Sequence, residues 1–518
     1  MNQIFDVAVI GGGINGCGIA ADASLRGLSV VLVEKDDLAS KTSSSSTKLI
    51  HGGLRYLEHY NFSLVKKSLD ERQLLLNLAP HLVRPIPFVL PFEQSIRPSW
   101  FLRAGLFLYD NLSRINKLPK SKLIKRNKKS LYFPPLAEEF KKGFLFYDCT
   151  TDDARLTLTN ALQAKKHGAT ILTETELVST KVVDGLWHLT TRTWGGEENT
   201  LIARSIVNAA GPWVESTNQR LNIPSQYKMS LIKGSHLVVH KLYEGDHAYL
   251  LQNDDKRIVF VIPYHGYSMI GTTDVVFSGN LDDVAISSEE IDYLFELVAN
   301  YFKKQLLREN IINTWSGVRP LIAAKADSPQ TLSRDYTYHF TKEPAPAITI
   351  YGGKITTYRQ LAEEAVNELK AVFPTLPESN TKASPLPGAL WGKMNYKNYC
   401  HYAHENYYWL DESILKRLLE TYGTNTEALL DGCKKISDLG LHFGNGLYQR
   451  EVDYLLQEEW ATTCEDILWR RTKLGLYFTA ESSGQLAEYL IKNKMRGSTR
   501  KNNVNITEPR PSGSVHEI

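Results

Sequence analysis

The chain has 518 residues, of which 42% are hydrophobic and 23% are charged, and its formal net charge is +3. This length predicts two or three domains with a sizeable core, and the nearly balanced charge gives no reason to expect nucleic acid as a partner. The cysteines lack a CxxC spacing, which predicts reduced thiols and no metal site. They are Cys17, Cys149, Cys400, Cys433 and Cys464.

The amino-terminal residues show no secretory signal, since they lack a basic segment followed by an apolar one. No run approaches the roughly 18 apolar residues that span a bilayer. The longest apolar cluster, residues 100–109, is interrupted by Arg103. We therefore expect any membrane contact to be peripheral.

The first 34 residues have the pattern of a dinucleotide-binding βαβ unit. An apolar run at 6–10 predicts a buried parallel strand that leads into the G-x-G-x-x-G of Gly11, Gly13 and Gly16. These glycines suit a tight turn, close approach of a pyrophosphate, and close packing of the helix whose amino end attracts phosphate. The next strand ends at Glu34, whose carboxylate accepts hydrogen bonds from a ribose and repels a 2′-phosphate. The unit therefore predicts FAD or NAD as the ligand.

Further motifs follow in chain order. They are TSSSSTKLIHGGLRYL at 42–57, DDARL at 152–156, NAAGPW at 208–213, KGSH at 233–236, GTTD at 271–274, GVRPL at 317–321, GGKITTYR at 352–359 and WRRTKLG at 469–475. Together they resemble the motifs of the FAD-dependent glycerol-3-phosphate dehydrogenases, over roughly residues 4–495, and most closely the aerobic, respiratory bacterial type. The resemblance favours FAD over NAD.

The residues of these motifs also suit a flavin site by their chemistry. Hydroxyl groups bind phosphate and ribitol oxygens without adding charge, and small residues at a strand end let the chain pass close to a cofactor. Amide donors of a loop that opens a helix stabilise the anionic pyrimidine edge of reduced flavin. We expect FAD to be bound by Gly11, Gly13, Gly16, Glu34, Ser43, Ser44, Ser45, Thr47, Ala210, Gly211, Gly353, Lys354, Thr356 and Thr357.

The resemblance implies oxidation of sn-glycerol 3-phosphate to dihydroxyacetone phosphate by hydride transfer to FAD. A site for this small dianion needs cations for the phosphate, whose binding orients the reacting carbon. By resemblance, the pocket cations are Arg55, Arg319, Arg334 and Lys354. The further hydrogen-bonding residues are Tyr56, His236 and Thr272.

The reaction also needs a proton acceptor beside the alcohol, and the sequence leaves three candidates. His236 and His51 qualify because a neutral imidazole acts as a base near pH 7. His236 is preferred because its motif opens a strand that should cross the substrate face. Arg319 with a displaced proton is the third candidate.

We expect an α/β fold with a Rossmann-type FAD-binding domain, an antiparallel β-sheet substrate (cap) domain and a C-terminal all-α domain. The FAD-binding domain is predicted to be discontinuous, at 1–80, 145–230 and 331–375. Residues 81–144 and 231–330 form the predicted substrate region, where Val, Ile, Tyr and Thr alternate as in antiparallel strands. One example is the predicted strand pair 257–262 and 267–270, joined by a turn that contains Gly266. A Pro-rich linker at 375–387 precedes the predicted helical domain at 388–495, and residues 496–518 are predicted to be disordered.

Residues 97–129 are predicted to contact a membrane. Aromatic and aliphatic residues at 100–109 precede eight basic residues between Arg114 and Lys129, a combination that binds an anionic lipid surface peripherally. The alternative is a core helix followed by a solvated basic loop. The resemblance implies a peripheral protein at the cytoplasmic face of the inner membrane that reduces quinone, and it is compatible with a homodimer.

Other functions stay open at this point. A glycerol-3-phosphate oxidase would pass the electrons to oxygen instead of quinone. A non-catalytic flavoprotein scaffold or sensor would bind FAD without turnover, although the pocket cations argue against it. An amine oxidase of related fold is disfavoured by the same cations.

Overall fold

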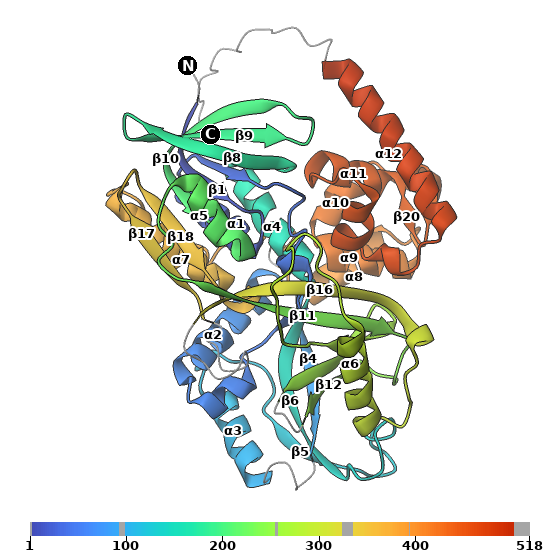
Figure 1. Ribbon diagram of the computed structural model, residues 1–518. Helices are drawn as coiled ribbons and strands as arrows, with labels where there is room; N and C mark the ends of the chain where they lie inside the picture. Colours follow the sequence, from blue (N-terminus) through green and yellow to red (C-terminus); the bar gives the residue numbers. More distant parts are fainter. Residues whose placement is uncertain (1–2, 93–98, 254–256, 324–334, 393, 502–518) are drawn as a thin grey trace. The chain divides into compact units, whose positions relative to one another are not determined.

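The computed structural model describes residues 3–92, 99–253, 257–323, 335–392 and 394–501 (Figure 1). The chain forms two compact units, residues 1–436 and 437–518. None of the described helices is both long and apolar enough to cross a bilayer.

The first sheet of the larger unit has the parallel centre expected of a dinucleotide-binding fold. Its path runs β17-β18-β10-β1-β2-β7, in which β1 pairs in parallel with β2 and β10, and β10 pairs in parallel with β18. A β8–β9 hairpin extends β10 in antiparallel fashion. The strands are β1 (Ile4–Ile10), β2 (Val30–Val33), β7 (Thr170–Leu172), β8 (Thr175–Val183), β9 (Leu186–Thr193), β10 (Glu198–Asn208), β17 (Thr337–Thr341) and β18 (Ala347–Tyr351).

The second sheet is mostly antiparallel and forms the cap. Its path runs β15-β11-β14-β13-β12-β4-β6-β3, with β16 beside β11 and β5 beside β6. The predicted hairpin around Gly266 is confirmed as the antiparallel pair β13–β14. The strands are β3 (Leu49–Ile50), β4 (Val83–Pro91), β5 (Lys122–Lys125), β6 (Lys142–Thr151), β11 (Met229–Val239), β12 (Ala248–Gln252), β13 (Ile258–Tyr264), β14 (Tyr267–Gly271), β15 (Val275–Val276) and β16 (Ile311–Ile322).

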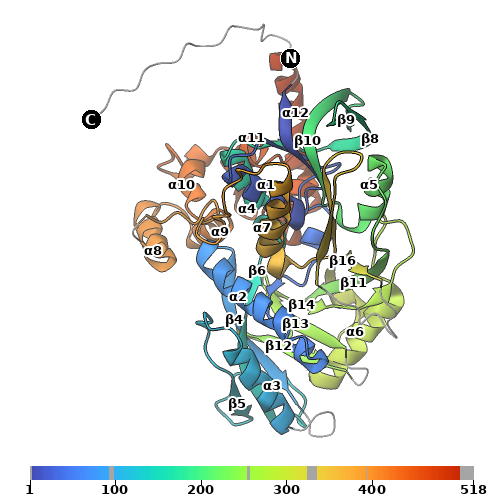
Figure 2. The same ribbon diagram turned by 90° about the vertical axis from the view of Figure 1, so that its left-hand side faces the viewer.

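Helices cover both sheets (Figures 1 and 2). In the first, α1 (Ile14–Leu25) packs against α4 (Asp153–Lys166) and α7 (Tyr358–Glu368), and α5 (Val214–Leu221) adjoins β18. The cap strands alternate their side chains between two apolar clusters, so that each face needs a cover. One face packs on α2 (Phe62–Leu78) and α3 (Ser99–Asn111), and the other on α6 (Ser288–Tyr301).

The carboxy-terminal part is mainly helical, as predicted. The helices α8 (Tyr396–Asn406), α9 (Glu412–Tyr422) and α10 (Asn425–Leu429) belong to the larger unit. The smaller unit holds α11 (Gln449–Glu458), α12 (Ala480–Lys501) and a two-stranded sheet of β19 (His442–Gly444) and β20 (Leu447–Tyr448).

The start of the predicted disordered tail requires a correction. Helix α12 continues through residues 496–501, because a helix that has already formed adds further residues at little cost, here even through Gly497, Ser498 and Thr499. Residues 502–518, the remainder of that prediction, lie outside the described residues.

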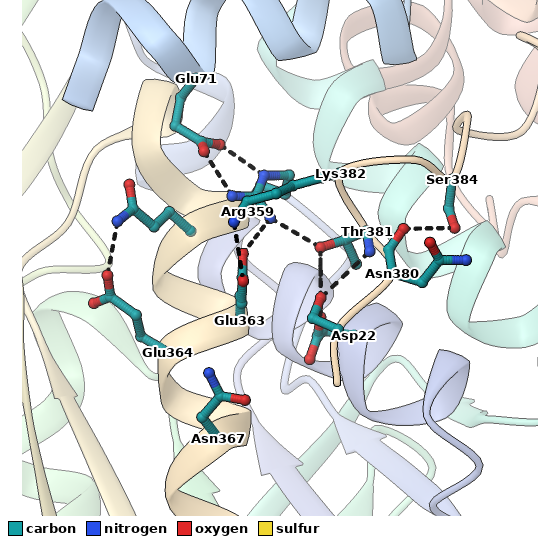
Figure 3. Close-up of polar contacts among 12 residues, drawn as sticks. Asp22, Glu71, Arg359, Glu363, Glu364, Asn367, Asn380, Thr381, Lys382 and Ser384 are labelled. Atoms are coloured by element: carbon teal, nitrogen blue, oxygen red, sulfur yellow. Dashed lines mark hydrogen bonds and ion pairs between the residues drawn. The ribbon is translucent and has the colours of Figure 1, made fainter. Parts of the chain in front are cut away.

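A buried polar network ties α1, α2 and α7 to the segment 379–384 (Figure 3). Glu71 of α2 accepts hydrogen bonds from Nε and Nη2 of Arg359 at 2.8 and 2.6 Å, and both side chains are only 4% exposed. Arg359 also donates to Glu363 and to Thr381. Breaking a buried ion pair by removing one partner is strongly destabilising. The network therefore fixes α7 relative to α2.

Candidate functional site

A cavity of about 520 Å³ lies within the larger unit and is lined from both of its sheets. The sequence-predicted residues that line it are Gly11, Gly13, Glu34, Ser43, Ser45, Thr47, His51, Arg55, Tyr56, Ala210, Gly211, His236, Thr272, Arg319, Gly353, Lys354 and Thr356. Gly16, Ser44 and Thr357 are not among the lining residues. Arg334 lies outside the described residues.

The glycine turn forms one end of the cavity. Helix α1 begins after Gly13, which has no side chain to cap it, and Gly13, Ile14 and Asn15 line the cavity. The Ile14 N–H donates to Ser43 Oγ, and the positive end of the helix dipole favours a phosphate here. A Cβ on Gly16 would lie 1.9 Å from the carbonyl oxygen of Gly11, which explains the packing role of this glycine. The Gly12 N–H donates to Glu34 at 2.6 Å, and burial raises the pKa of Glu34.

The serine-rich stretch is held in place by a residue of another motif. Asp153, at the amino end of α4, accepts hydrogen bonds from the N–H and hydroxyl of Ser46 at 3.0 and 2.7 Å. Lys48 Nζ donates to the same carboxylate at 2.8 Å, and both side chains are buried. Ser43 Oγ in turn accepts from the N–H of Ile14 at 2.9 Å. The loop is thus tied to the first turn of α1.

Lys48 and Asp153 were absent from the predicted site. The sequence signal for Lys48 is its place directly before the apolar pair Leu49–Ile50, because a lysine next to buried residues needs an anionic partner. No spacing rule identifies that partner, because it lies 105 residues away.

The glycine pair before α7 lines the cavity beside the start of α1, where Asn15 Nδ2 donates to the Gly352 carbonyl at 3.2 Å. Gly352 and Gly353 have φ values of +75° and +113°, which turn the chain into the short 3-10 helix Ile355–Thr357. Lys354 Nζ lies 4.0 Å from the centre of the Tyr56 ring, so two predicted substrate residues meet here. Asn15 Oδ1 and the Thr357 hydroxyl are buried without a hydrogen-bond partner among the described residues. The amino end of α1, the glycine turn and these unpaired oxygens fit FAD.

His236 of β11 lines the cavity and is buried. Its Nε2 is 3.0 Å from the Thr47 hydroxyl, and its ring stacks on Trp315 of β16 with centroids 5.5 Å apart. Lys48 Nζ lies 4.8 Å from the Trp315 ring centre. Burial, followed by the charges of Lys48 and Arg319, holds the pKa of His236 well below its usual value. The imidazole is therefore neutral at physiological pH.

Arg319 of β16 enters the cavity with its guanidinium already oriented. It donates to Asp274 and, at 2.8 Å, to the hydroxyl of Thr272. A Cβ on Gly234 would lie 2.0 Å from Arg319 Nη2, so the glycine of the KGSH motif makes room for this side chain. The arrangement places a fixed cation near His236, because β11 and β16 are paired strands.

A second, apolar part of the cavity extends along the cap sheet. It is lined by Phe88, Phe146, Leu250, Ile258 and Phe260. The ring of His51, which also lines the cavity, lies 6.2 Å from that of Phe260. Among the described residues no group of three or more His, Cys, Asp or Glu side chains could hold a metal ion.

Two family models match the chain. Residues 6–359 match the FAD dependent oxidoreductase family, and residues 379–492 match the C-terminal domain of alpha-glycerophosphate oxidase. The first match covers more than half of the chain and includes every described residue of the cavity.

Individual relatives are similar over nearly their whole length. A glycerol-3-phosphate dehydrogenase of Pseudomonas aeruginosa is 49% identical, with 94% of this chain and 95% of the relative covered. A D-erythritol 1-phosphate dehydrogenase of Brucella abortus is 44% identical, with 93% and 97% covered. Among solved structures, glycerol-3-phosphate dehydrogenase from Bacillus halodurans complexed with FAD matches with a TM-score of 0.76 and 27% identity, covering 96% of this chain and 91% of that chain.

Proposed function

Because this chain belongs to the FAD-dependent glycerol-3-phosphate dehydrogenases, we propose that it oxidises sn-glycerol 3-phosphate to dihydroxyacetone phosphate. The observation that carries this proposal is the convergence of Arg55, Lys354 and Arg319 on a cavity that fits FAD. A phosphate dianion suits such a cluster, since arginine pairs with two of its oxygens at once. When bound, FAD supplies the hydride acceptor.

The chain's residues orient the substrate and receive its proton. Anchoring of the phosphate by the cations positions the alcohol carbon, and Thr272 and Tyr56 add hydrogen bonds. We assign the proton acceptor to His236, whose neutral ring lines the cavity and is fixed by Thr47. Burial and the charges of Lys48 and Arg319 lower its pKa and make it a weak base, and the charge of a bound phosphate dianion would offset these two cations. His51 and Arg319 are the alternative acceptors.

Anaerobic mixing with substrate tests the proposed activity. Glycerol 3-phosphate should bleach the flavin absorbance, whereas glycerol at the same concentration should do so far more slowly. An unchanged spectrum would mean that the protein is a non-catalytic flavoprotein or uses another substrate.

D-erythritol 1-phosphate is a second candidate substrate, supported by the relative from Brucella abortus. It carries the same phosphate and one more hydroxylated carbon, so the cations alone do not distinguish it. Comparing kcat/KM for the two substrates would decide between them. A higher value for erythritol phosphate would replace the first proposal.

We further propose that the electrons pass to a membrane quinone and that the cap binds an anionic lipid surface through α3 and the chain that follows it. Leu102, Leu106 and Tyr109 of α3 are buried, whereas Trp100 and Phe107 on its other side are 69% and 65% exposed. A large exposed apolar patch favours a membrane or protein contact over a solvated face. Helix α3 and β5 lie at the end of the larger unit opposite the β8–β9 hairpin (Figures 1 and 2).

The basic residues beside α3 differ in what they can contribute. Arg126 is only 17% exposed and donates to the carbonyl groups of Leu136, Ala137 and Phe140, so it supports the fold. The exposed lysines remain for lipid. They include Lys122, Lys125, Lys128 and Lys129.

Changing these four lysines to glutamine should move the protein off anionic vesicles. Each charge near such a surface contributes up to about 1 kcal/mol, and salt screens it. Sedimentation with vesicles measures binding, and reduction of a soluble dye measures the flavin site. Undiminished sedimentation would refute this membrane contact. Peroxide formed in stoichiometric amount with substrate would instead identify a glycerol-3-phosphate oxidase that uses oxygen.

A further inference from the structure

A carboxylate from the cap lines the cofactor cavity, although it lies far from the glycine turn in the sequence. Asp282 lies in the loop between β15 and α6, and its Oδ1 is 2.8 Å from Lys35 Nζ and 3.1 Å from Lys41 Nζ. Both lysines come from the segment that follows β2. All three side chains line the cavity, so the contact crosses its edge.

The two lysines are held by further contacts on the dinucleotide-binding side. Lys35 Nζ lies 4.6 Å from the centre of the Trp213 ring, and Lys41 Nζ lies 3.4 Å from Asp36 Oδ2. Trp213 also lines the cavity. The hydrogen bond from Lys35 lowers the pKa of Asp282, which therefore stays ionised at neutral pH. Three separate segments thus meet in one contact.

The loop that carries Asp282 is anchored where it returns to the cap. Lys233 Nζ donates to the carbonyl of Ala285 at 2.8 Å and pairs with Glu290 of α6 at 2.9 Å. The Asp282 N–H donates to Asn280 Oδ1 at 3.1 Å, which orders the tip of the loop. The carboxylate is thus presented to the lysines by an ordered segment.

The position of this contact identifies the part of FAD beneath it. Lys35 follows Glu34 directly, and an acid at the end of the second strand receives the ribose of the adenosine half. The proposed substrate cations Arg319 and Lys354 belong to the other walls of the cavity. We propose that Asp282, Lys35 and Lys41 form an ionic latch that closes over the adenosine half of FAD and limits the rate of FAD release.

The latch should have a moderate effect that depends on salt. Its members are partly exposed, and Asp282 is 49% exposed. Two such pairs sharing one carboxylate should slow FAD release by about three- to tenfold at low ionic strength. At 1 M salt the Debye length is roughly 3 Å, so most of this effect should be lost.

The test compares FAD release from the holoenzyme of wild type and two variants. Asp282→Asn removes the latch, whereas Asp283→Asn makes the same charge change one residue away, at a side chain that accepts a hydrogen bond from Asn280 Nδ2 at 3.5 Å. Release is followed by the fluorescence of free FAD after dilution, at low salt and at 1 M NaCl. Lys41→Gln, which keeps the 2.8 Å pair, should give an intermediate rate.

Faster release from Asp282→Asn at low salt, converging with wild type at 1 M NaCl, would support the latch. Release at the wild-type rate, or equal acceleration in Asp283→Asn, would overturn it. A difference that persists unchanged at high salt would also overturn it, since a Coulombic latch must be screened. None of these readouts depends on the identity of the substrate, so they stand apart from the proposed dehydrogenase activity.

Discussion

Replacement of Arg319 by alanine should separate phosphate recognition from the rest of the chemistry. Arg319 is 22% exposed and is oriented by Asp274 and Thr272, so its guanidinium is already in place when substrate arrives. Removing one partner of a desolvated charge pair costs about 2–5 kcal/mol. This corresponds to a fall in kcat/KM of roughly 30- to 5,000-fold, at 1.36 kcal/mol for each factor of ten.

The same substitution also perturbs stability, and the assay must distinguish the two effects. Asp274 is only 7% exposed and would lose its cation, at a cost of about 1–3 kcal/mol in the free energy of unfolding. The double variant Arg319→Met/Asp274→Asn removes both charges and should recover part of that stability without recovering activity. Thermal unfolding and FAD content measured on the same samples provide the comparison.

The decisive measurement is kcat/KM with glycerol 3-phosphate and with glycerol, which lacks the phosphate. If Arg319 binds the phosphate, the first value falls steeply and the second, although small, barely changes. An equal loss on both substrates would refute the phosphate role. It would point to Arg319 as the proton acceptor, or as a support of the fold if the double variant also remains unstable.

Three further predictions concern the cofactor site and the core. Gly13→Ala should yield protein depleted of FAD, since the added methyl lies 3.1 Å from Ser43 Oγ and faces the pyrophosphate, and full yellow colour after purification would contradict it. Asp153→Asn should weaken FAD binding by tenfold or more, because the carboxylate that holds Lys48 and Ser46 is lost. A tenfold change corresponds to about 1.4 kcal/mol, which is on the order of the contribution of a hydrogen bond to a charged group, and FAD titration of the apoprotein measures it. Burial lowers the pKa of His81 to about 3 in the folded protein, so this side chain stays neutral there at mildly acidic pH. In the unfolded chain the same histidine takes up a proton below about pH 6.5, so the free energy of unfolding decreases as the pH falls. His81→Gln should reduce the loss between pH 7 and pH 5 by about 2 kcal/mol in denaturant unfolding, and an unchanged loss would be evidence against a neutral His81.

The sequence predicts the parts of the fold that depend on neighbours in the chain. The turn of Gly11 and Gly13, the acid at Glu34 and the hairpin at Gly266 each follow from a few consecutive residues. The cap sheet could be predicted as antiparallel because its strands alternate over short stretches. Such patterns express local rules of backbone geometry.

The rest could not be predicted, because it depends on partners far apart in the chain. Nothing near Lys48 identifies Asp153 as its partner, and nothing near Lys35 identifies Asp282. Arg126 lies among lysines in the same basic stretch of sequence, yet its guanidinium donates hydrogen bonds to the carbonyl groups of Leu136, Ala137 and Phe140. Polar contacts of this kind are set by tertiary packing and leave no periodic trace in the sequence.

The discontinuous first sheet has a consequence for synthesis of the chain on the ribosome. Strand β1 lies between β2 and β10, and β10 also pairs with β18. Arg26, at the carboxy end of α1, donates to the side chain of Asn367, which lies 341 residues later in the chain. At translation rates of about 5–20 residues per second, that interval lasts roughly 17–70 s. The cap strands β11 to β14 can pair within this time. The cavity at the glycine turn also needs residues that follow β10 and the loop before α7, and that loop is synthesised after the cap strands. A complete FAD cavity therefore exists only late in translation, after β18 and the loop before α7 have been synthesised.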